Sequence, residues 1–149
     1  MLSIRQAVPE DAAVLAQFNV ELARESENLA LDPAWVKAGV AALLRDPSKG
    51  TYFVAESEGA VVGQLLITHE WSDWRNGDFW WLQSVYVRPD FRRRGVFQAL
   101  FDHVLAGARR QGDVAGIRLY VEKNNHPALK TYHRLGLTET HYHVMERLL

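Results

Sequence analysis

The feature that most limits the fold of this 149-residue chain is an abrupt change of hydrophobic period near its middle. Residues 79–87 alternate as a strand does, and Pro89 ends that pattern. After Arg92–Gly95, which reads RRRG, apolar residues recur at helical spacing through residues 96–108. A strand that turns directly into a helix presents unpaired backbone N–H groups at the positive end of the helix. The junction is therefore a predicted anion-binding site, and phosphate is the expected ligand.

The remaining patterns predict an α/β chain in which strands precede and follow helices. A helix is expected after Pro9, and a second one from Asp32-Pro33, which supplies a capping side chain followed by proline at the first helical position. A short helix over 125–135 is closed by Gly136. Strands are predicted over residues 3–7, 51–56, 60–69, 79–87, 117–121 and 138–147. We expect one domain, residues 1–149.

Composition excludes several classes of protein. No apolar run approaches the roughly 18 residues of a spanning helix, and the first residues lack the order of a secretory signal. The chain has no cysteine, so disulfides and thiolate metal sites are excluded. A net charge of −1 and the lack of a wider basic stripe argue against nucleic acid as a partner. We expect a cytoplasmic protein with no membrane or nucleic-acid partner and no metal.

The basic junction has two interpretations when it is taken alone. Arg92 to Arg94 would be a solvated basic turn in one, and anion ligands in the other. Two common nucleotide motifs, GxxxxGK[ST] and GxGxxG, are absent. The position of the turn between a strand and a helix favours the anion site.

Two motifs in order give the chain a resemblance to the GNAT superfamily of acyl-CoA-dependent N-acetyltransferases. The signature [R/Q]xxGx[G/A] is matched by Arg92–Phe97, with Phe97 in place of the usual Gly or Ala. A second pattern, NxxAxxxY followed by LG, is matched by Asn125, Ala128 and Tyr132 and by Leu135-Gly136. With the order of elements, the resemblance covers essentially the whole chain. It implies a mixed, mostly antiparallel sheet of six to seven strands flanked by four helices.

The resemblance also implies acetyl-CoA as the acyl donor. The fourth and fifth strands would part, and the backbone of the fourth would hold the pantetheine arm as an added strand would. The diphosphate would rest on the amides that open the next helix, helped by the side chain of Arg92 or Arg94. Lys130 or Lys123 would meet the phosphates. The implied cofactor residues are Val85, Tyr86, Val87, Arg92, Arg93, Arg94, Gly95, Val96, Phe97, Gln98, Asn125 and Lys130.

The implied reaction is direct attack of a primary amine on the thioester. The Val85 backbone N–H would stabilise the oxyanion, and Tyr132 would protonate the departing thiolate. Spacing alone favours Tyr132 as an ordinary core aromatic of its helix, and the match to NxxAxxxY favours the catalytic role. An alkyl amine with a pKa near 10.4 must lose a proton before it attacks. Glu21, Glu25 and Glu27 are candidate bases, each also readable as part of a solvated helix face, and Glu25 is the one we assign.

The acceptor side is marked by the aromatic stretch WSDWRNGDFWW, residues 71–81. Alternation places Trp80 and Leu82 on one face of the strand, and Phe79, Trp81 and Gln83 on the other. Aromatic faces and carboxylates suit an organic cation, although such rings also form cores and dimer contacts. The candidate acceptor residues are Glu21, Glu25, Trp71, Trp74, Trp81 and Gln83.

Some alternatives stay open at this point. The fourth strand lacks the glutamate that many relatives carry there, and Gln83 or Ser84 could only orient a water. A catalytically silent module that senses acyl-CoA is therefore the second hypothesis. His141 and His143 share a face of the last predicted strand, but no third ligand accompanies them. The acceptor, a small-molecule or peptide amine, and a homodimer are also left undecided.

Overall fold

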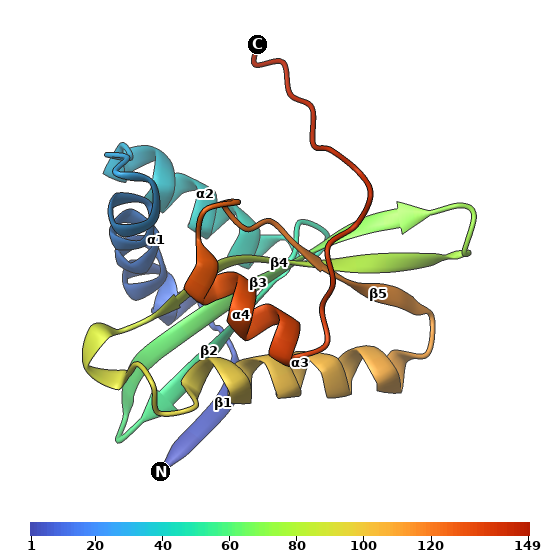
Figure 1. The fold of residues 1–149 in the computed structure, drawn as a ribbon. Helices are drawn as coiled ribbons and strands as arrows, with labels where there is room; N and C mark the ends of the chain where they lie inside the picture. The colour runs from blue at the N-terminus through green and yellow to red at the C-terminus, as the bar shows by residue number, and fades with distance from the viewer. The chain divides into compact units, whose positions relative to one another are not determined.

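The computed structural model describes residues 1–149 and divides into two compact units, Met1–Leu119 and Tyr120–Leu149. The first unit carries three helices on a five-stranded sheet, and the second carries one helix (Figure 1). The elements of the first unit are β1 (Leu2–Gln6), η1 (Pro9–Asp11), α1 (Ala12–Glu27), α2 (Pro33–Arg45), β2 (Thr51–Ser57), β3 (Ala60–Ser72), β4 (Gly77–Val87), η2 (Pro89–Phe91), α3 (Val96–Gln111) and β5 (Val114–Leu119). The second unit contains α4 (His126–Arg134).

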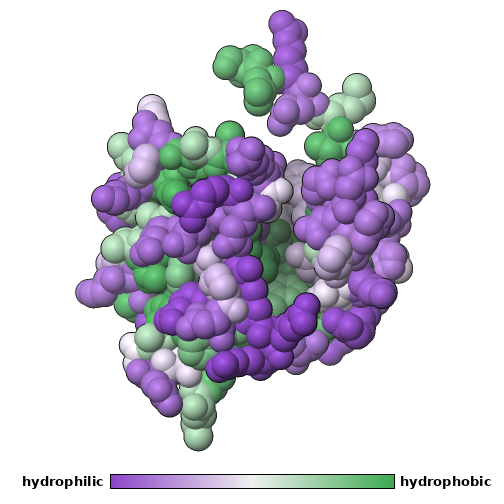
Figure 2. Space-filling view, turned by 60° about the vertical axis from the view of Figure 1, so that its left-hand side comes forward, coloured by the Kyte–Doolittle hydropathy of each residue, from purple (hydrophilic) through white to green (hydrophobic).

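The sheet is mixed and mostly antiparallel, as predicted. Its strands follow chain order, β1 to β5, and each neighbouring pair is antiparallel except β4 and β5, which are parallel. Helices cover both faces: Tyr52 and Val54 of β2 pack with α1 and α2, whereas Phe53 stacks on His103 of α3. Figure 1 shows α3 crossing below the strands and α1 with α2 on the other side. Figure 2 shows a surface on which hydrophilic side chains predominate.

The strand count was wrong: the sheet has five strands, not six to seven, because residues 138–147 form no strand. Alternating side chains make a strand only where a neighbouring backbone offers a hydrogen-bond ladder. No strand pairs with this segment, and its large apolar residues face solvent, with Val144 70% and Met145 91% exposed. The predicted His141 and His143 pair therefore lies on an exposed tail rather than on a sheet face.

The predicted helix ends are confirmed by their caps. The Asp32 carboxylate accepts a hydrogen bond from the Ala34 amide at 2.9 Å, directly before Pro33. The Asn125 side chain accepts from the Ala128 amide at 3.3 Å and opens α4. Gly112 ends α3 in the left-handed conformation with φ of 86°. No helix of the structure has the length and apolar character needed to cross a membrane.

One ion-pair network ties the first strand to the first helical turn. The Arg5 guanidinium donates to both carboxylate oxygens of Asp11, at 2.8 and 3.0 Å, and to Glu56 of β2 at 2.9 Å. Asp11 is buried and also accepts from the Val8 amide at 2.8 Å. The Arg5 hydrogen bonds hold the pKa of Asp11 below its usual 3.8, although burial acts in the opposite direction.

Replacing Asp11 should therefore destabilise the fold in a pH-dependent way. We expect Asp11→Ala to lower the free energy of unfolding by about 2 kcal/mol at pH 7, because charged hydrogen bonds are lost. A carboxylate with a depressed native pKa stabilises above its unfolded pKa, and this contribution fades as pH falls from about 5 through the native pKa. Urea titrations at pH 7 and pH 3 test this, with exposed Glu10→Ala as the control. A stability difference that is equally large at pH 3 would contradict it.

Candidate functional site

A bulge interrupts β4 three residues before its end. Gln64 pairs with Tyr86 and Leu66 pairs with Gln83, so Ser84 and Val85 stand opposite the single residue Leu65. Ser84 has φ of 51°, in the left-handed region that non-glycine residues rarely adopt. The bulge turns the peptide between Ser84 and Val85 out of the regular ladder.

The same end of β4 has an edge without a strand partner. The parallel ladder between β4 and β5 ends at the pair Leu82 and Leu119, whereas β4 continues to Val87. Residues 83–87 therefore pair with β3 on one side only. The ladder stops where β5 itself ends, at Leu119, so β4 extends five residues beyond its parallel partner. An exposed strand edge of this kind can accept an extended ligand as an additional strand.

The loop that follows β4 is shaped to present backbone amides. Arg93 and Gly95 both have positive φ, 62° and 79°, and Gly95 caps α3. The Ala99 amide donates a hydrogen bond to the Gly95 carbonyl, which begins the hydrogen-bond pattern of α3. The amides of Val96 and Gln98 lie in the first turn of α3, where the helix itself supplies no carbonyl acceptor. Alternating left-handed residues and a helix N-terminus together form a concave site for an anion.

Arg92, Arg93 and Arg94 are all exposed, but the Arg92 side chain is bound by two protein groups. The Arg92 Nε donates to the Val87 carbonyl at 2.8 Å, and its Nη2 donates to Glu25 of α1 at 2.7 Å. Arg94 lies over the Phe91 ring, 5.2 Å from its centroid. The sequence predicted Arg92 or Arg94 as the phosphate ligand. Arg92 forms an ion pair with Glu25, and Arg94 forms no ion pair with a protein carboxylate. Arg92 fixes the loop to the end of β4 and to α1.

Tyr86 is the centre of a cluster that sequence reasoning did not identify. Its side chain is buried against Phe18, with ring centroids 4.9 Å apart. Its hydroxyl donates to Glu21 Oε2 at 2.8 Å and lies 3.5 Å from Glu25 Oε1. Burial, followed by the hydrogen bond to Glu21, raises the pKa of Tyr86 to about 12. Tyr86 therefore stays protonated and keeps two carboxylates of α1 at the end of β4.

A shallow hollow lies beside Glu21. It has a volume of about 400 Å³ and is lined by Glu21 and Phe18 of α1, by Arg88 and Pro89 after β4, and by three other residues. The predicted acceptor residues Glu21 and Glu25 are thus beside the predicted cofactor residues Tyr86 and Arg92. A glutamate pair of this kind attracts a cationic group.

The predicted residues of the C-terminal part belong to the second unit. Asn125 caps α4, Lys130 is exposed on it, and Tyr132 lies on the half-buried face that also carries Ala128 and Leu129. Burial raises the pKa of the Tyr132 hydroxyl. A tyrosine with a raised pKa keeps its proton at neutral pH and is available as an acid.

The tryptophan stretch is not gathered at the bulge. Trp71 is 60% and Trp74 84% exposed in and beside the hairpin turn between β3 and β4. Trp71 pairs with Asp78, seven residues before Val85 and roughly 23 Å away along an extended strand. Trp81 donates from its indole to Glu70 at 2.8 Å, and Gln83 donates to Thr68 at 2.6 Å. Of the acceptor residues predicted on β3, β4 and the turn between them, Gln83 is the one next to the bulge.

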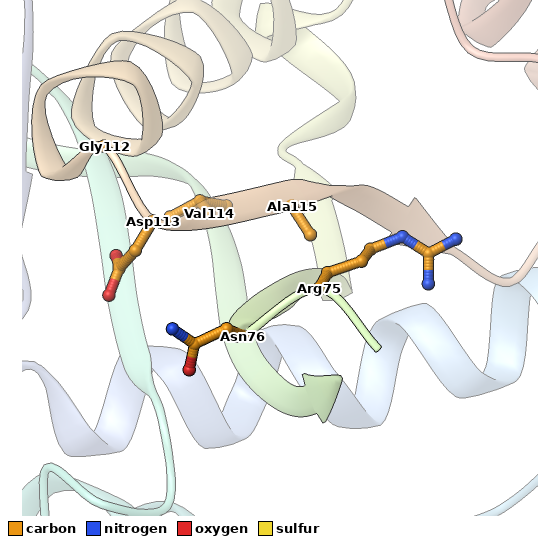
Figure 3. Close-up of a pocket in the computed structure, with 6 residues that line it drawn as sticks. All are labelled: Arg75, Asn76, Gly112, Asp113, Val114 and Ala115. Carbon is orange, nitrogen blue, oxygen red and sulfur yellow. The ribbon is translucent and has the colours of Figure 1, made fainter. Parts of the chain in front are cut away.

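A second hollow lies at that distant end of the sheet (Figure 3). It measures about 440 Å³ and is lined by Arg75 and Asn76 of the turn and by residues 112–115 at the start of β5. The two backbones approach closely there, so that a Cβ on Gly77 would overlap the Asp113 carbonyl oxygen. Figure 3 shows the side chains of Arg75 and Asp113 directed away from each other. This hollow is not at the bulge.

Comparison with known proteins identifies the family of the chain. The model of the acetyltransferase (GNAT) family matches residues 15–137. An uncharacterized N-acetyltransferase of Methanocaldococcus jannaschii is 32% identical over 89 residues, which are 59% of this chain and 39% of that protein. The chain thus matches well under half the length of this curated relative.

Solved structures give a likeness over the full length. A possible acetyltransferase from Clostridium difficile 630 is 42% identical, with a TM-score of 0.95 over 100% of this chain and 98% of the other. A predicted acetyltransferase from Clostridium acetobutylicum, solved with acetyl-CoA, shares the fold at 15% identity, with a TM-score of 0.80 over 99% of this chain and 96% of the other. The chain belongs to the GNAT family of acetyltransferases.

Proposed function

We propose that this protein transfers the acetyl group of acetyl-CoA to a primary amine, carried by a small molecule or exposed on a protein, by direct attack. One observation carries the proposal. Within one short run of chain, the bulge at Ser84, the unpaired edge of residues 83–87 and the left-handed loop before α3 follow one another. These features suit, in order, a thioester carbonyl, a pantetheine arm and a diphosphate.

Binding of acetyl-CoA would use backbone groups more than side chains. The amides of the pantetheine arm pair with Val85 to Val87 along the open edge. The diphosphate accepts hydrogen bonds from the loop and first-turn amides, and the exposed Arg94 adds charge. Asn125 and Lys130 keep the cofactor-binding roles that the family resemblance implies. Arg92 acts indirectly, since its guanidinium is bound to Val87 and Glu25.

The reaction needs a donor for the oxyanion, a base and an acid. The amine nitrogen attacks the thioester carbonyl carbon, and the Val85 N–H donates to the oxygen as negative charge develops on it. The carbon–sulfur bond then breaks, and Tyr132 gives its proton to the departing thiolate. The proton of the amine passes to Glu21 or Glu25, directly or through water. Glu25 is paired with Arg92, whereas Glu21 accepts hydrogen bonds only from Tyr86 and Gln17. Glu21 is therefore the more available of the two carboxylates as a base.

Binding and turnover separate this proposal from a silent acyl-CoA sensor. Calorimetric titration with acetyl-CoA and CoA measures binding, and thiol release over a panel of amines measures transfer. The proposal predicts binding of both ligands and turnover with at least one amine. Binding without turnover on any amine would favour the sensor, and no binding would contradict both functions.

Removing the acid should slow the reaction without weakening the cofactor complex. We expect Tyr132→Phe to lower kcat by about 10²-fold, a typical contribution of general acid catalysis. The dissociation constant of acetyl-CoA should change little, because only a hydroxyl group is removed. Tyr142→Phe, on the exposed tail of the same unit, is the control and should behave as wild type. Unchanged turnover in Tyr132→Phe would remove Tyr132 from the mechanism.

The left-handed conformation of Gly95 should matter for the cofactor specifically. Gly95 and Gly59 both have φ of 79°, and a Cβ on either would meet no atom within 4 Å. Each alanine substitution should therefore cost about 1 kcal/mol of stability through backbone strain alone. Gly95→Ala should also raise the dissociation constant of acetyl-CoA by about tenfold, equivalent to about 1.4 kcal/mol, as the loop amides shift. Calorimetry on both variants tests this, and equal affinity in the two would refute a role for the loop.

A further inference from the structure

A buried glutamine lies beside the bulge and is not used by the proposed mechanism. Gln64 of β3 is fully buried, and its Nε2 donates to the Ser84 carbonyl at 2.9 Å and to Asn19 Oδ1 at 2.8 Å. Asn19 of α1 in turn donates from Nδ2 to the Tyr52 hydroxyl at 2.9 Å. This chain of side chains connects α1 and β2 to one backbone carbonyl of the bulge.

The orientation of the Gln64 amide is fixed by its partner. A backbone carbonyl can only accept, so the NH₂ group of Gln64 must face Ser84. Its Oε1 then points elsewhere, is buried, and has no hydrogen-bond partner. An unsatisfied buried oxygen costs free energy that an apolar side chain at this position would avoid. An apolar side chain would, however, leave the Ser84 carbonyl without this donor, so the donating end of Gln64 is the end that acts on the bulge.

The contact with Ser84 determines the direction of the Val85 amide. The Ser84 carbonyl and the Val85 N–H belong to one planar trans peptide, in which they point in opposite directions. Holding the oxygen toward Gln64 therefore directs the Val85 N–H away from Gln64. A carbonyl that accepts a hydrogen bond also polarises its peptide, which strengthens the N–H as a donor.

We propose that Gln64 is a positioning residue, which holds the Ser84–Val85 peptide so that the Val85 N–H meets the oxyanion. The inference rests on the proposed function, because that function makes Val85 the oxyanion donor. Asn19 supports Gln64 by occupying the second hydrogen of its amide. The left-handed Ser84 gives the peptide its turned orientation, and Gln64 keeps it there.

The first test replaces the donor by a side chain of similar length. Gln64→Met should lower kcat by about 10²-fold, near the effect of losing an oxyanion donor, and leave the dissociation constant of CoA unchanged. Asn19→Ala, at a half-buried position of the same network, should lower kcat less, and it is the variant to measure if Gln64→Met does not fold. Val62→Ala, buried on the same strand, is the control for lost stability and should keep kcat.

A second readout makes the inference testable without turnover. In ¹⁵N-labelled protein, Gln64→Met should move the Val85 amide resonance more than that of Val87, whereas Val62→Ala should not. If the wild type is active and Gln64→Met keeps the full kcat, the positioning role is overturned and the proposed function stands. An inactive wild type would overturn the proposed function, and an unmoved Val85 resonance would overturn the inference in either case.

Discussion

The register shift at Ser84 is the constraint on which the rest of the site depends. Residues directly opposite in a ladder share a face, so Gln83, opposite Leu66, and Tyr86, opposite Gln64, lie on the face covered by α1. Without the extra residue, regular alternation would send Tyr86 to the other face. Its hydroxyl could then not reach Glu21, and Gln64 would not meet the Ser84 carbonyl. One inserted residue thus places the tyrosine, the carboxylates and the turned peptide together.

Helix α1 secures this end of the sheet through three polar residues. Asn19 holds Gln64, Glu21 holds Tyr86, and Glu25 holds Arg92 of the following loop. The contacts of Glu21 and Glu25 reach the end of β4 and the loop directly, and that of Asn19 reaches the bulge through Gln64. The helix therefore keeps the bulge, the open edge and the loop in a fixed relation, which the proposed positioning of a thioester against an oxyanion donor would require.

Much of the fold could be predicted because its signals are local. Proline and capping residues at Asp32 and Asn125 mark helix starts, and the change of period around Arg92 marks the strand-to-helix junction. The alternation that put Trp80 and Leu82 on one face and Trp81 and Gln83 on the other is confirmed by the pairing with β3. The tail was misjudged because alternation does not reveal whether a partner strand exists.

The site features that could not be predicted from the sequence depend on contacts between residues that are far apart in the chain. The bulge at Ser84 results from pairing with β3, and no pattern within β4 announces it. Arg92 looked like a phosphate ligand, but its partner Glu25 is 67 residues away in the chain. A buried glutamine within an apolar strand was the one available signal for the Gln64 network, since such residues need a partner.

The most direct measurement is a titration of ¹⁵N-labelled protein with CoA, followed residue by residue through the backbone amide resonances. If the end of β4 is the cofactor site, the largest changes fall on residues 84–87 and 93–98. Changes confined to the distant hollow around Arg75 and Asp113, or no changes at saturating CoA, would contradict that assignment.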